Sequence, residues 1–224
     1  IDMGDYAFGR PSRITAKTYA GSGGVVHIER ETDMADASHN KGILILTGYL
    51  GNTYAQETPL SFSASITFEQ NYSGVGGDSA SMAELIALVS SLTNVPILQG
   101  IAITGSMNQH GQAQAIGGVT EKIEGFFRVC KKNGFSGKQG VIIPSVNANE
   151  LMLGEEVIAA VQAGQFNVWP VEHVEQALEI ITGKRVGKQR KDGTFAATTL
   201  HGRMMARLAA FARKGDEDEE DDKA

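Results

Sequence analysis

Apolar residues recur with two different periods along residues 1–183, and the alternation of these periods predicts a mixed α/β domain. Every second residue of 61–69 is apolar, which is typical of a strand with one buried face. The next apolar set recurs every third or fourth residue between Met82 and Leu92. This spacing predicts a helix that ends at Asn94.

Short apolar runs bounded by glycine or polar residues predict the other strands. These runs lie at 25–29, 43–46, 101–104, 113–116, 141–144 and 166–171. Helical spacing predicts further helices that begin near Thr120 and cover 155–163 and 173–182. The polar loop 106–112 is expected to join the two strands on either side of it.

The charge of the chain is distributed unevenly, and this divides the chain into three parts. There are 26 acidic against 20 basic residues, and an apolar content of 42% is that of an ordinary globular protein. Residues 184–214 hold nine basic residues and one acid, whereas 216–222 are all acidic. We therefore predict a domain at 1–183, a basic extension at 184–214 and an acidic, disordered tail at 215–224. In the extension, four apolar residues could line one face of a short helix: Leu200, Met204, Leu208 and Phe211.

The sequence also limits where the protein works. No apolar run approaches the roughly 20 residues needed to cross a bilayer, so no membrane partner is expected. The single cysteine, Cys130, cannot form an internal disulfide, which favours a reducing compartment and predicts a cytoplasmic location. The chain begins with Ile1 rather than methionine, so its first residues are expected to be a linker from an upstream module.

The first candidate for chemistry is Ser79, which follows Asp78 between the glycine-rich turn 73–77 and the start of a helix. Backbone N–H groups and the positive end of the helix dipole at such a junction can stabilise the oxyanion of acyl transfer. Serine at a helix start is more often a simple cap, so both interpretations stay open. The esterase motif G-x-S-x-G does not fit, because Ser81 stands where its second glycine belongs.

The second candidate is Lys122, which follows Gly117 and Gly118 in the first turn of the next helix. The helix dipole disfavours an ammonium there, and packing against Phe126 one turn later would desolvate it. Both effects lower the pKa of a lysine, as a general base that works near neutrality requires. The alternative is an ordinary surface lysine.

Metal and nucleotide sites are not predicted. The histidines show no pairing at metal-ligand spacing: His27, His39, His110, His173 and His201. Cys130 lies on the apolar face of its helix and is expected in the core. No G-x-x-x-x-G-K-[ST] motif occurs, so this segment is not expected to bind or hydrolyse ATP.

Ser79 and Lys122 together match a known pattern. From about Gly42 to Gly183, the sequence resembles the proteolytic domain of Lon proteases, particularly the B-type and Lon-like branches. The resemblance runs through 47–51, 77–81, 104–105 and 116–122, and the spacing between the serine and the lysine is that of the family. Residues 184–224 match no part of the pattern. The resemblance implies a compact α/β (α+β) fold like the second domain of ribosomal protein S5, assembled as a homo-hexameric ring.

The resemblance also implies the chemistry. Ser79 would be the nucleophile of a serine endopeptidase acting on polypeptides, and Lys122 would be its only general base. Thr104 would hydrogen-bond the lysine, with Asp78 in support. Substrate is expected as an extended strand beside the backbone of the 74–77 segment: Gly74, Val75, Gly76 and Gly77. No cofactor is expected in this fragment, while ATP and Mg²⁺ would serve an upstream ATPase module.

One departure from the family pattern and one alternative function bear on this interpretation. Many B-type relatives carry an acidic residue three positions before the serine, where this chain has Gly76. Lon-like domains also occur as non-catalytic parts of DNA-handling proteins, and the basic 184–214 segment would suit contact with phosphates. The presence of serine, lysine and threonine at the family spacing favours the peptidase. Because no dyad residue lies in 184–224, deletion of that segment is expected to leave peptide hydrolysis largely intact.

Overall fold

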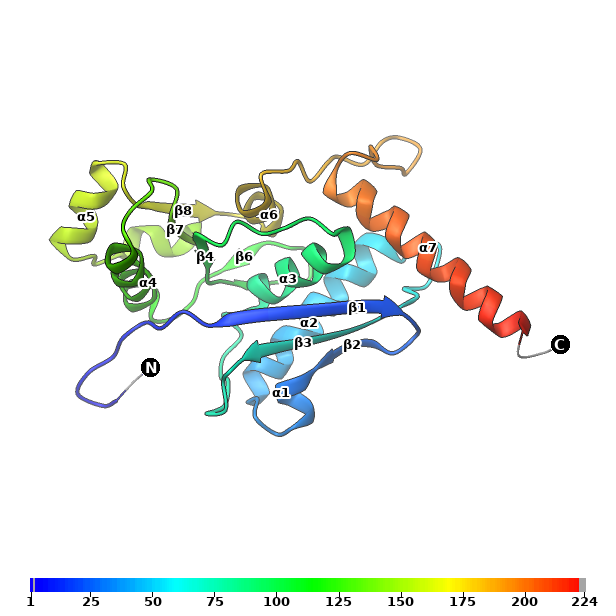
Figure 1. Cartoon of the computed structure of the whole chain (residues 1–224), viewed down its shortest axis with the longest axis horizontal. Coiled ribbons are helices and arrows are strands. Elements are labelled where there is room, and N and C mark those ends of the chain that lie inside the picture. Colours follow the sequence, from blue (N-terminus) through cyan, green and yellow to red (C-terminus); the bar gives the residue numbers. More distant parts are fainter. Residues whose placement is uncertain (2, 222–224) are drawn as a thin grey trace.

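The computed structural model describes residues 1 and 3–221, with the backbone alone for 215–221. Its first sheet has the strand order β1-β3-β2 (Figure 1). Strand β1 (Arg13–Ala20) runs antiparallel to β3 (Phe62–Glu69), and β2 (Gly24–His27) runs parallel to β3. The alternation predicted for 61–69 is confirmed, because Phe62, Ala64 and Ile66 are all fully buried. Strand β2 is shorter than the predicted run, since the short helix α1 (Ile28–Glu31) follows it directly.

The second sheet has the order β4-β7-β8, with all strands parallel. Its strands are β4 (Ile101–Ile103), β7 (Gly140–Pro144) and β8 (Asn167–Val171). The central strand β7 is buried along its whole length, so it needs a partner on each side. The strand assignments at 101–104, 141–144 and 166–171 are therefore confirmed to within a residue or so at their ends.

The two strands predicted on either side of the loop 106–112 are present, but they do not pair with each other. Strand β4 pairs with β7, and the loop itself begins with β5 (Ser106–Met107), which pairs antiparallel with β6 (Ala113–Gln114). The chain changes direction at Gly105, whose N–H and C=O bond the backbone around Ser79 and Met82 instead of continuing the sheet.

Helix α2 (Ala37–Tyr54) contains the 43–46 run, so the strand predicted there is wrong. The buried residues of α2 recur at helical spacing through Ile43, Leu46 and Leu50. The helix also has a strong start, because the Asp36 carboxylate accepts a 2.7 Å hydrogen bond from the His39 N–H. Helix α3 (Ser81–Thr93) ends at Asn94 as predicted, in a left-handed conformation with φ of 52°.

The remaining helices pack on the second sheet. Helix α4 (Val119–Asn133) contacts β7, and its apolar face forms a core with α5 (Glu155–Gln162) and Phe166. A 3₁₀ segment, η1 (Ser145–Glu150), follows β7. Helix α6 (Val174–Thr182) ends at Gly183, as the sequence predicts. These helices place the loop before α3 and the first turn of α4 side by side, where the site lies.

Helix α7 (Leu200–Asp221) crosses the other end of the molecule and packs on α3, β1 and β3 (Figure 1). The predicted apolar face is confirmed, since all four of its residues are at least nine-tenths buried: Leu200, Met204, Leu208 and Phe211. They join Val186 in the main core, so parts of the basic segment 184–214 pack on the rest of the domain. The backbone of 215–221 is helical, whereas the sequence predicts a disordered tail; residues 222–224 lie outside the described part.

Over the described residues, no helix combines the length and apolar character that a membrane span requires.

Candidate active site

Ser79 and Lys122 are 43 residues apart in the chain and meet directly in space. The Lys122 Nζ donates a 3.0 Å hydrogen bond to the Ser79 Oγ. Ser79 stands two residues before α3, and the cap position of that helix is Ala80, whose side chain makes no capping bond. The hydroxyl of Ser79 is thus held by the lysine amine, and the geometry favours the nucleophile interpretation over the helix cap.

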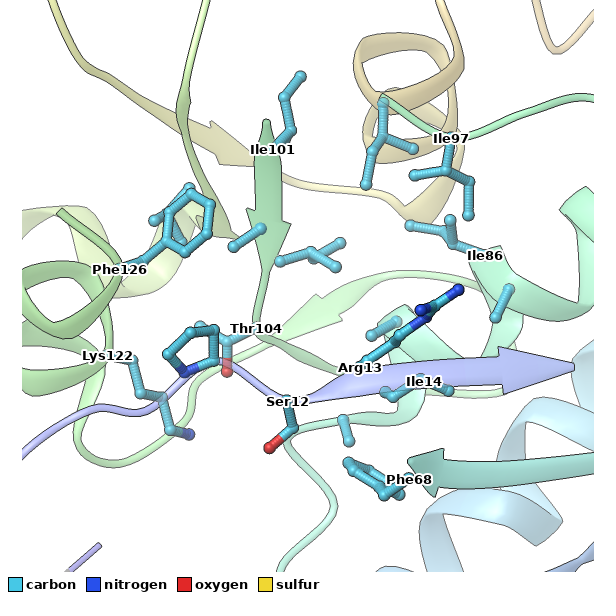
Figure 2. A pocket seen from close by; sticks show the side chains of 18 of the residues that line it. Ser12, Arg13, Ile14, Phe68, Ile86, Ile97, Ile101, Thr104, Lys122 and Phe126 are labelled. Carbon is cyan, nitrogen blue, oxygen red and sulfur yellow. The ribbon is translucent and has the colours of Figure 1, made fainter. Parts of the chain in front are cut away.

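The peptide of Ser79 is fixed by the end of β4. Its carbonyl oxygen accepts a 2.8 Å hydrogen bond from the Gly105 N–H and a 3.4 Å bond from the Thr104 hydroxyl. The resemblance implied that Thr104 would bond the lysine, whereas its hydroxyl here is directed to the serine carbonyl. Thr104 and Lys122 line the same cavity and lie close together in Figure 2. A side chain at Gly105 would meet the Met82 Sδ at 2.6 Å, which explains the glycine.

Lys122 is more than half-buried in the first turn of α4, and burial lowers its pKa below the ordinary lysine value. The charges of two nearby carboxylates, Asp78 and Glu121, raise the pKa of Lys122 and so offset part of the effect of burial. The Asp78 carboxylate is itself positioned by the buried Ser106, whose hydroxyl donates to Oδ2 at 2.8 Å. Asp78 therefore acts on the lysine through its charge, and Ser106 fixes where that charge lies.

The serine and the lysine open into a cavity of about 520 Å³ between the N-terminal segment, α3, β4 and α4. Figure 2 shows Lys122 and Thr104 at one end, with Ile86, Ile97 and Ile101 lining the other. A polar end with a paired hydroxyl and amine beside an apolar space is the arrangement that acyl transfer to a serine needs, with room for an apolar side chain of a substrate.

Comparison with known proteins agrees with this geometry. Residues 74–183 match the model of the Lon protease (S16) C-terminal proteolytic domain. A Lon protease homolog of Escherichia coli is 49% identical over 175 residues, which is 78% of this chain and 30% of the relative. A Lon protease homolog of Haemophilus influenzae is 42% identical over 205 residues, 92% of this chain and 34% of the relative. The chain belongs to the Lon protease family.

An archaeal Lon protease of Thermococcus kodakarensis is more distant, at 35% identity over 173 residues, 71% of this chain and 25% of the relative. The chain thus spans about a third of the length of its bacterial relatives. The Haemophilus alignment covers 92% of the chain, so it must extend into 184–224. Part of that segment therefore aligns with a Lon homolog, whereas the sequence alone suggests no match to the family pattern there.

The Lon domain uses part of the predicted substrate segment for its own structure. Val75 forms a parallel bridge to Ala35: its N–H donates to the Met34 carbonyl at 2.8 Å, and its carbonyl accepts from the Asp36 N–H at 3.0 Å. The Gly77 N–H donates to the Asp36 carboxylate. Residues alternate in direction along an extended chain, so Val75 and Gly77 are engaged on one side and Gly76 faces the other.

The position of Asp36 also explains why residue 76 is a glycine. A side chain at position 76 would place its first carbon 2.8 Å from the Asp36 Oδ2. The Asp36 carboxylate thus occupies the space beside position 76. Backbone hydrogen bonds from His39 and Gly77 hold the pKa of Asp36 below its usual value, so it carries its negative charge there.

The N-terminal residues, which the sequence predicts to be a linker from an upstream module, are packed against the site. Residues 10–13 line the same cavity as Ser79 and Lys122. Gly9 lies against α4 so closely that a side chain on it would meet the Glu121 carbonyl at 2.2 Å. The reverse contact is equally close, since a side chain at Gly125 would meet the Gly9 carbonyl at 2.1 Å.

Sequence reasoning found Ser79, Lys122, Thr104 and Asp78, and the structure brings all four together. Sequence reasoning missed the residues that position them: Asp36, Ser106, Gly9 and Gly125. An aspartate three residues before His39 is a recognisable helix cap, and a glycine inside α4 is a recognisable sign of close backbone approach. The contact of Ser106 with Asp78 leaves no such signal in the sequence.

Proposed function

We propose that this chain is the proteolytic domain of a serine endopeptidase that cleaves unfolded polypeptides through an acyl-enzyme, with Ser79 as nucleophile and Lys122 as general base. The observation that carries the proposal is the 3.0 Å contact between the Lys122 Nζ and the Ser79 Oγ, with the lysine pKa lowered by burial. Membership of the Lon family supports the same reaction.

In the proposed reaction, neutral Lys122 takes the proton of the Ser79 hydroxyl while its oxygen attacks the carbonyl carbon of the peptide bond. Backbone N–H groups at the start of α3, including that of Ser79, stabilise the oxyanion. The C–N bond then breaks, and the protonated lysine returns the proton to the leaving amine. Water, activated by the same amine, hydrolyses the ester and regenerates the serine.

The substrate is proposed to bind as an extended strand beside 74–77, with pairing through Gly76, because Val75 and Gly77 already bond residues 34–36. These glycines leave the backbone accessible, and a second cavity of about 830 Å³ runs along Gly74, Val75 and Gly76. It shares Arg13 and Phe68 with the cavity of the dyad, so a substrate strand in it leads to Ser79.

For the whole protein we propose a cytoplasmic, ATP-dependent protease that assembles as a six-membered ring. An upstream ATPase module, with ATP and Mg²⁺, would unfold substrates and deliver them to this domain. The support is family membership, together with the finding that this chain covers about a third of its bacterial relatives.

The dyad is tested with Ser79→Ala, Lys122→Arg and a matched control, Lys132→Arg, on the exposed side of the same helix. Arginine keeps the positive charge of Lys122 but offers no accessible neutral form. We expect both dyad variants to lose at least about a hundredfold in peptide hydrolysis, roughly 2.7 kcal/mol of barrier, and the control to keep it.

A fluorophosphonate probe followed by mass spectrometry of the peptide that contains residue 79 provides a second measurement. The proposal requires labelling of wild-type Ser79 and strongly reduced labelling in folded Lys122→Arg. A folded wild-type domain that neither hydrolyses peptides nor reacts with the probe would favour the non-catalytic alternative.

A further inference from the structure

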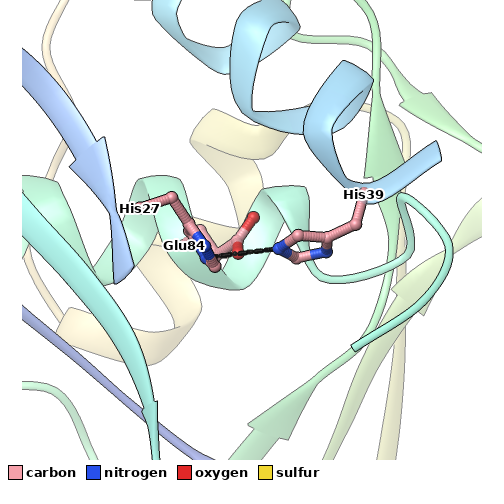
Figure 3. Close-up of side chains that lie close together, drawn as sticks. All are labelled: His27, His39 and Glu84. Carbon is pink, nitrogen blue, oxygen red and sulfur yellow. Dashed lines mark hydrogen bonds and ion pairs between the residues drawn. The ribbon is translucent and has the colours of Figure 1, made fainter. Parts of the chain in front are cut away.

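Three buried side chains from three different elements converge beneath the loop that precedes Ser79. His27 ends β2, His39 lies in the first turn of α2, and Glu84 lies in the first turn of α3 (Figure 3). All three are at most 1% exposed. The Nε2 atoms of the two histidines are 3.2 Å apart, and they lie 2.9 Å and 3.1 Å from the Glu84 Oε1.

The other nitrogen of each imidazole faces an acceptor. The His27 Nδ1 is 3.3 Å from the Glu29 Oε2, and the His39 Nδ1 is 3.2 Å from the Gly77 carbonyl oxygen. Glu29 is fixed in this position because its other oxygen accepts 2.8 Å bonds from the Thr67 hydroxyl and the Phe68 N–H. A proton on the His39 Nδ1 satisfies the Gly77 carbonyl, whereas the His27 Nδ1 and the Glu29 Oε2 are buried without a hydrogen bond among the described residues. Protons on both Nδ1 atoms leave both Nε2 lone pairs directed at the Glu84 oxygen.

The doubly neutral and the doubly charged states of the two imidazoles each leave a conflict in this arrangement. With both imidazoles neutral and protonated on Nδ1, three electron-rich atoms face one another at 2.9–3.2 Å without a donor between them. With both imidazoles charged, two N–H donors share one carboxylate oxygen while like charges lie 3.2 Å apart. A divalent cation at the centre removes both conflicts, and its charge balances the carboxylates of Glu29 and Glu84.

We propose that His27, His39 and Glu84 bind a structural zinc ion. Zinc takes imidazole nitrogen and carboxylate oxygen at about 2.0–2.2 Å in a tetrahedral sphere, which places neighbouring ligand atoms roughly 3.3–3.5 Å apart. The three atoms need to move outward by only a few tenths of an ångström. The Glu84 Oε2 is buried without a hydrogen-bond partner among the described residues, so it or a water molecule takes the fourth position.

The groups behind the ligands also fit a metal. Histidines that bind metals generally donate their second N–H to a carboxylate or a backbone carbonyl. Here the Gly77 carbonyl bonds the His39 Nδ1, and the Glu29 carboxylate lies 3.3 Å from the His27 Nδ1 without a hydrogen bond to it. The sequence predicts no zinc site because positions 27, 39 and 84 lack ligand spacing along the chain. That argument does not apply to a site assembled from three separate elements.

The metal would hold the loop that carries the nucleophile. The Gly77 carbonyl contacts the His39 imidazole, and the Gly77 N–H donates to the Asp36 carboxylate. The start of α2 therefore fixes the backbone on both sides of Gly77. Gly77 lies two residues before Ser79. Zinc binding at His39 therefore fixes the position of the serine without contact with substrate, which makes these three residues positioning residues rather than catalytic ones.

The test is a metal analysis of the purified chain prepared with zinc in the medium. We expect about one zinc per chain by plasma mass spectrometry and a zinc-edge X-ray absorption spectrum with imidazole ligands. Chelation should lower the melting temperature, and added Zn²⁺ should restore it. Co²⁺ in place of zinc should give the visible absorption of a four-coordinate site.

His39→Gln and Glu84→Gln should lose the metal and its stabilising effect, whereas His201→Gln, which removes a buried histidine elsewhere, should keep both. Ser79→Ala should bind zinc normally, so the metal and the peptidase proposals can fail separately. If the two ligand variants fail to fold, the absorption spectra of the wild-type protein decide. A chain that binds neither zinc nor cobalt, or equal metal in folded His39→Gln, overturns the proposal.

Discussion

At the scale of single residues, the pKa of Lys122 is set by opposing influences that can be separated by mutation. Burial lowers the pKa, and the charge of Asp78 raises it. If neutral Lys122 is the base, hydrolysis rises with pH through its folded-state pKa. Asp78→Asn removes the larger of the two raising influences and leaves that of Glu121, so the rise should move to lower pH.

The pH dependence of kcat/KM on a fluorogenic peptide measures this shift. Ser106→Ala is the matched comparison, because it releases the Asp78 carboxylate but keeps its charge, and its profile should move less. An Asp78→Asn profile that moves to higher pH would mean that the carboxylate does not act through the charge of Lys122.

The catalytic residues of the site are more predictable from the sequence than the residues that position them. Ser79 and Lys122 stand at the starts of helices, where hydrogen-bonding and dipole effects are local and visible in the sequence. The 2.8 Å contact between Ser106 and Asp78 depends on where β4 ends and β5 begins, as does the contact of Thr104 with the Ser79 carbonyl. Those positions come from tertiary packing, which periodicity does not report.

At the scale of elements, the N-terminal segment and α4 approach each other very closely. Gly125→Ala would bring a methyl group to 2.1 Å from the Gly9 carbonyl, so either the segment or the helix must shift. We expect a loss of about 1–3 kcal/mol in the free energy of unfolding, despite the higher helix propensity of alanine. Because Lys122 lies one turn earlier on α4, peptide hydrolysis should fall as well.

Gly51→Ala is the control for this prediction, since Gly51 lies inside α2 with open space around it. It should stabilise the protein by up to about 1 kcal/mol. Urea unfolding followed by circular dichroism measures both variants. Equal effects of the two substitutions would show that the crossing at Gly9 is not tightly packed.

The elements that sequence reasoning got wrong share a cause. The run at 43–46 has four apolar residues in a row, which a buried strand and a buried helix both allow. This run forms a helix because helical spacing places Ile43, Leu46 and Leu50 together in the core, on the side of α3. The Asp36 cap also stabilises the start of this helix. Strand β3 was predictable since one of its faces is polar, which makes its period unambiguous.

At the scale of the whole molecule, α7 decides where the domain ends. Its arginines are exposed: Arg203, Arg207 and Arg213. Contact of this segment with phosphates therefore stays a prediction. Its other face contributes four side chains to the main core, which by burial amounts to roughly 6–12 kcal/mol as an upper bound. Domains of this kind are stable by only about 5–15 kcal/mol. The burial of this face therefore leads to a different prediction from the sequence, which predicts that deletion of 184–224 leaves peptide hydrolysis largely intact.

Truncation at Gly183 should expose this core, lower the melting temperature strongly and abolish peptide hydrolysis, although every proposed catalytic residue remains. Truncation at Lys214 is the control, because it removes the acidic run and keeps the buried face of α7. Met204→Ala is the milder variant, with an expected loss of about 2–5 kcal/mol. Thermal unfolding and peptide hydrolysis are measured on all three proteins. A chain of residues 1–183 that unfolds cooperatively at the wild-type temperature would show that α7 is only attached to a domain that is complete without it.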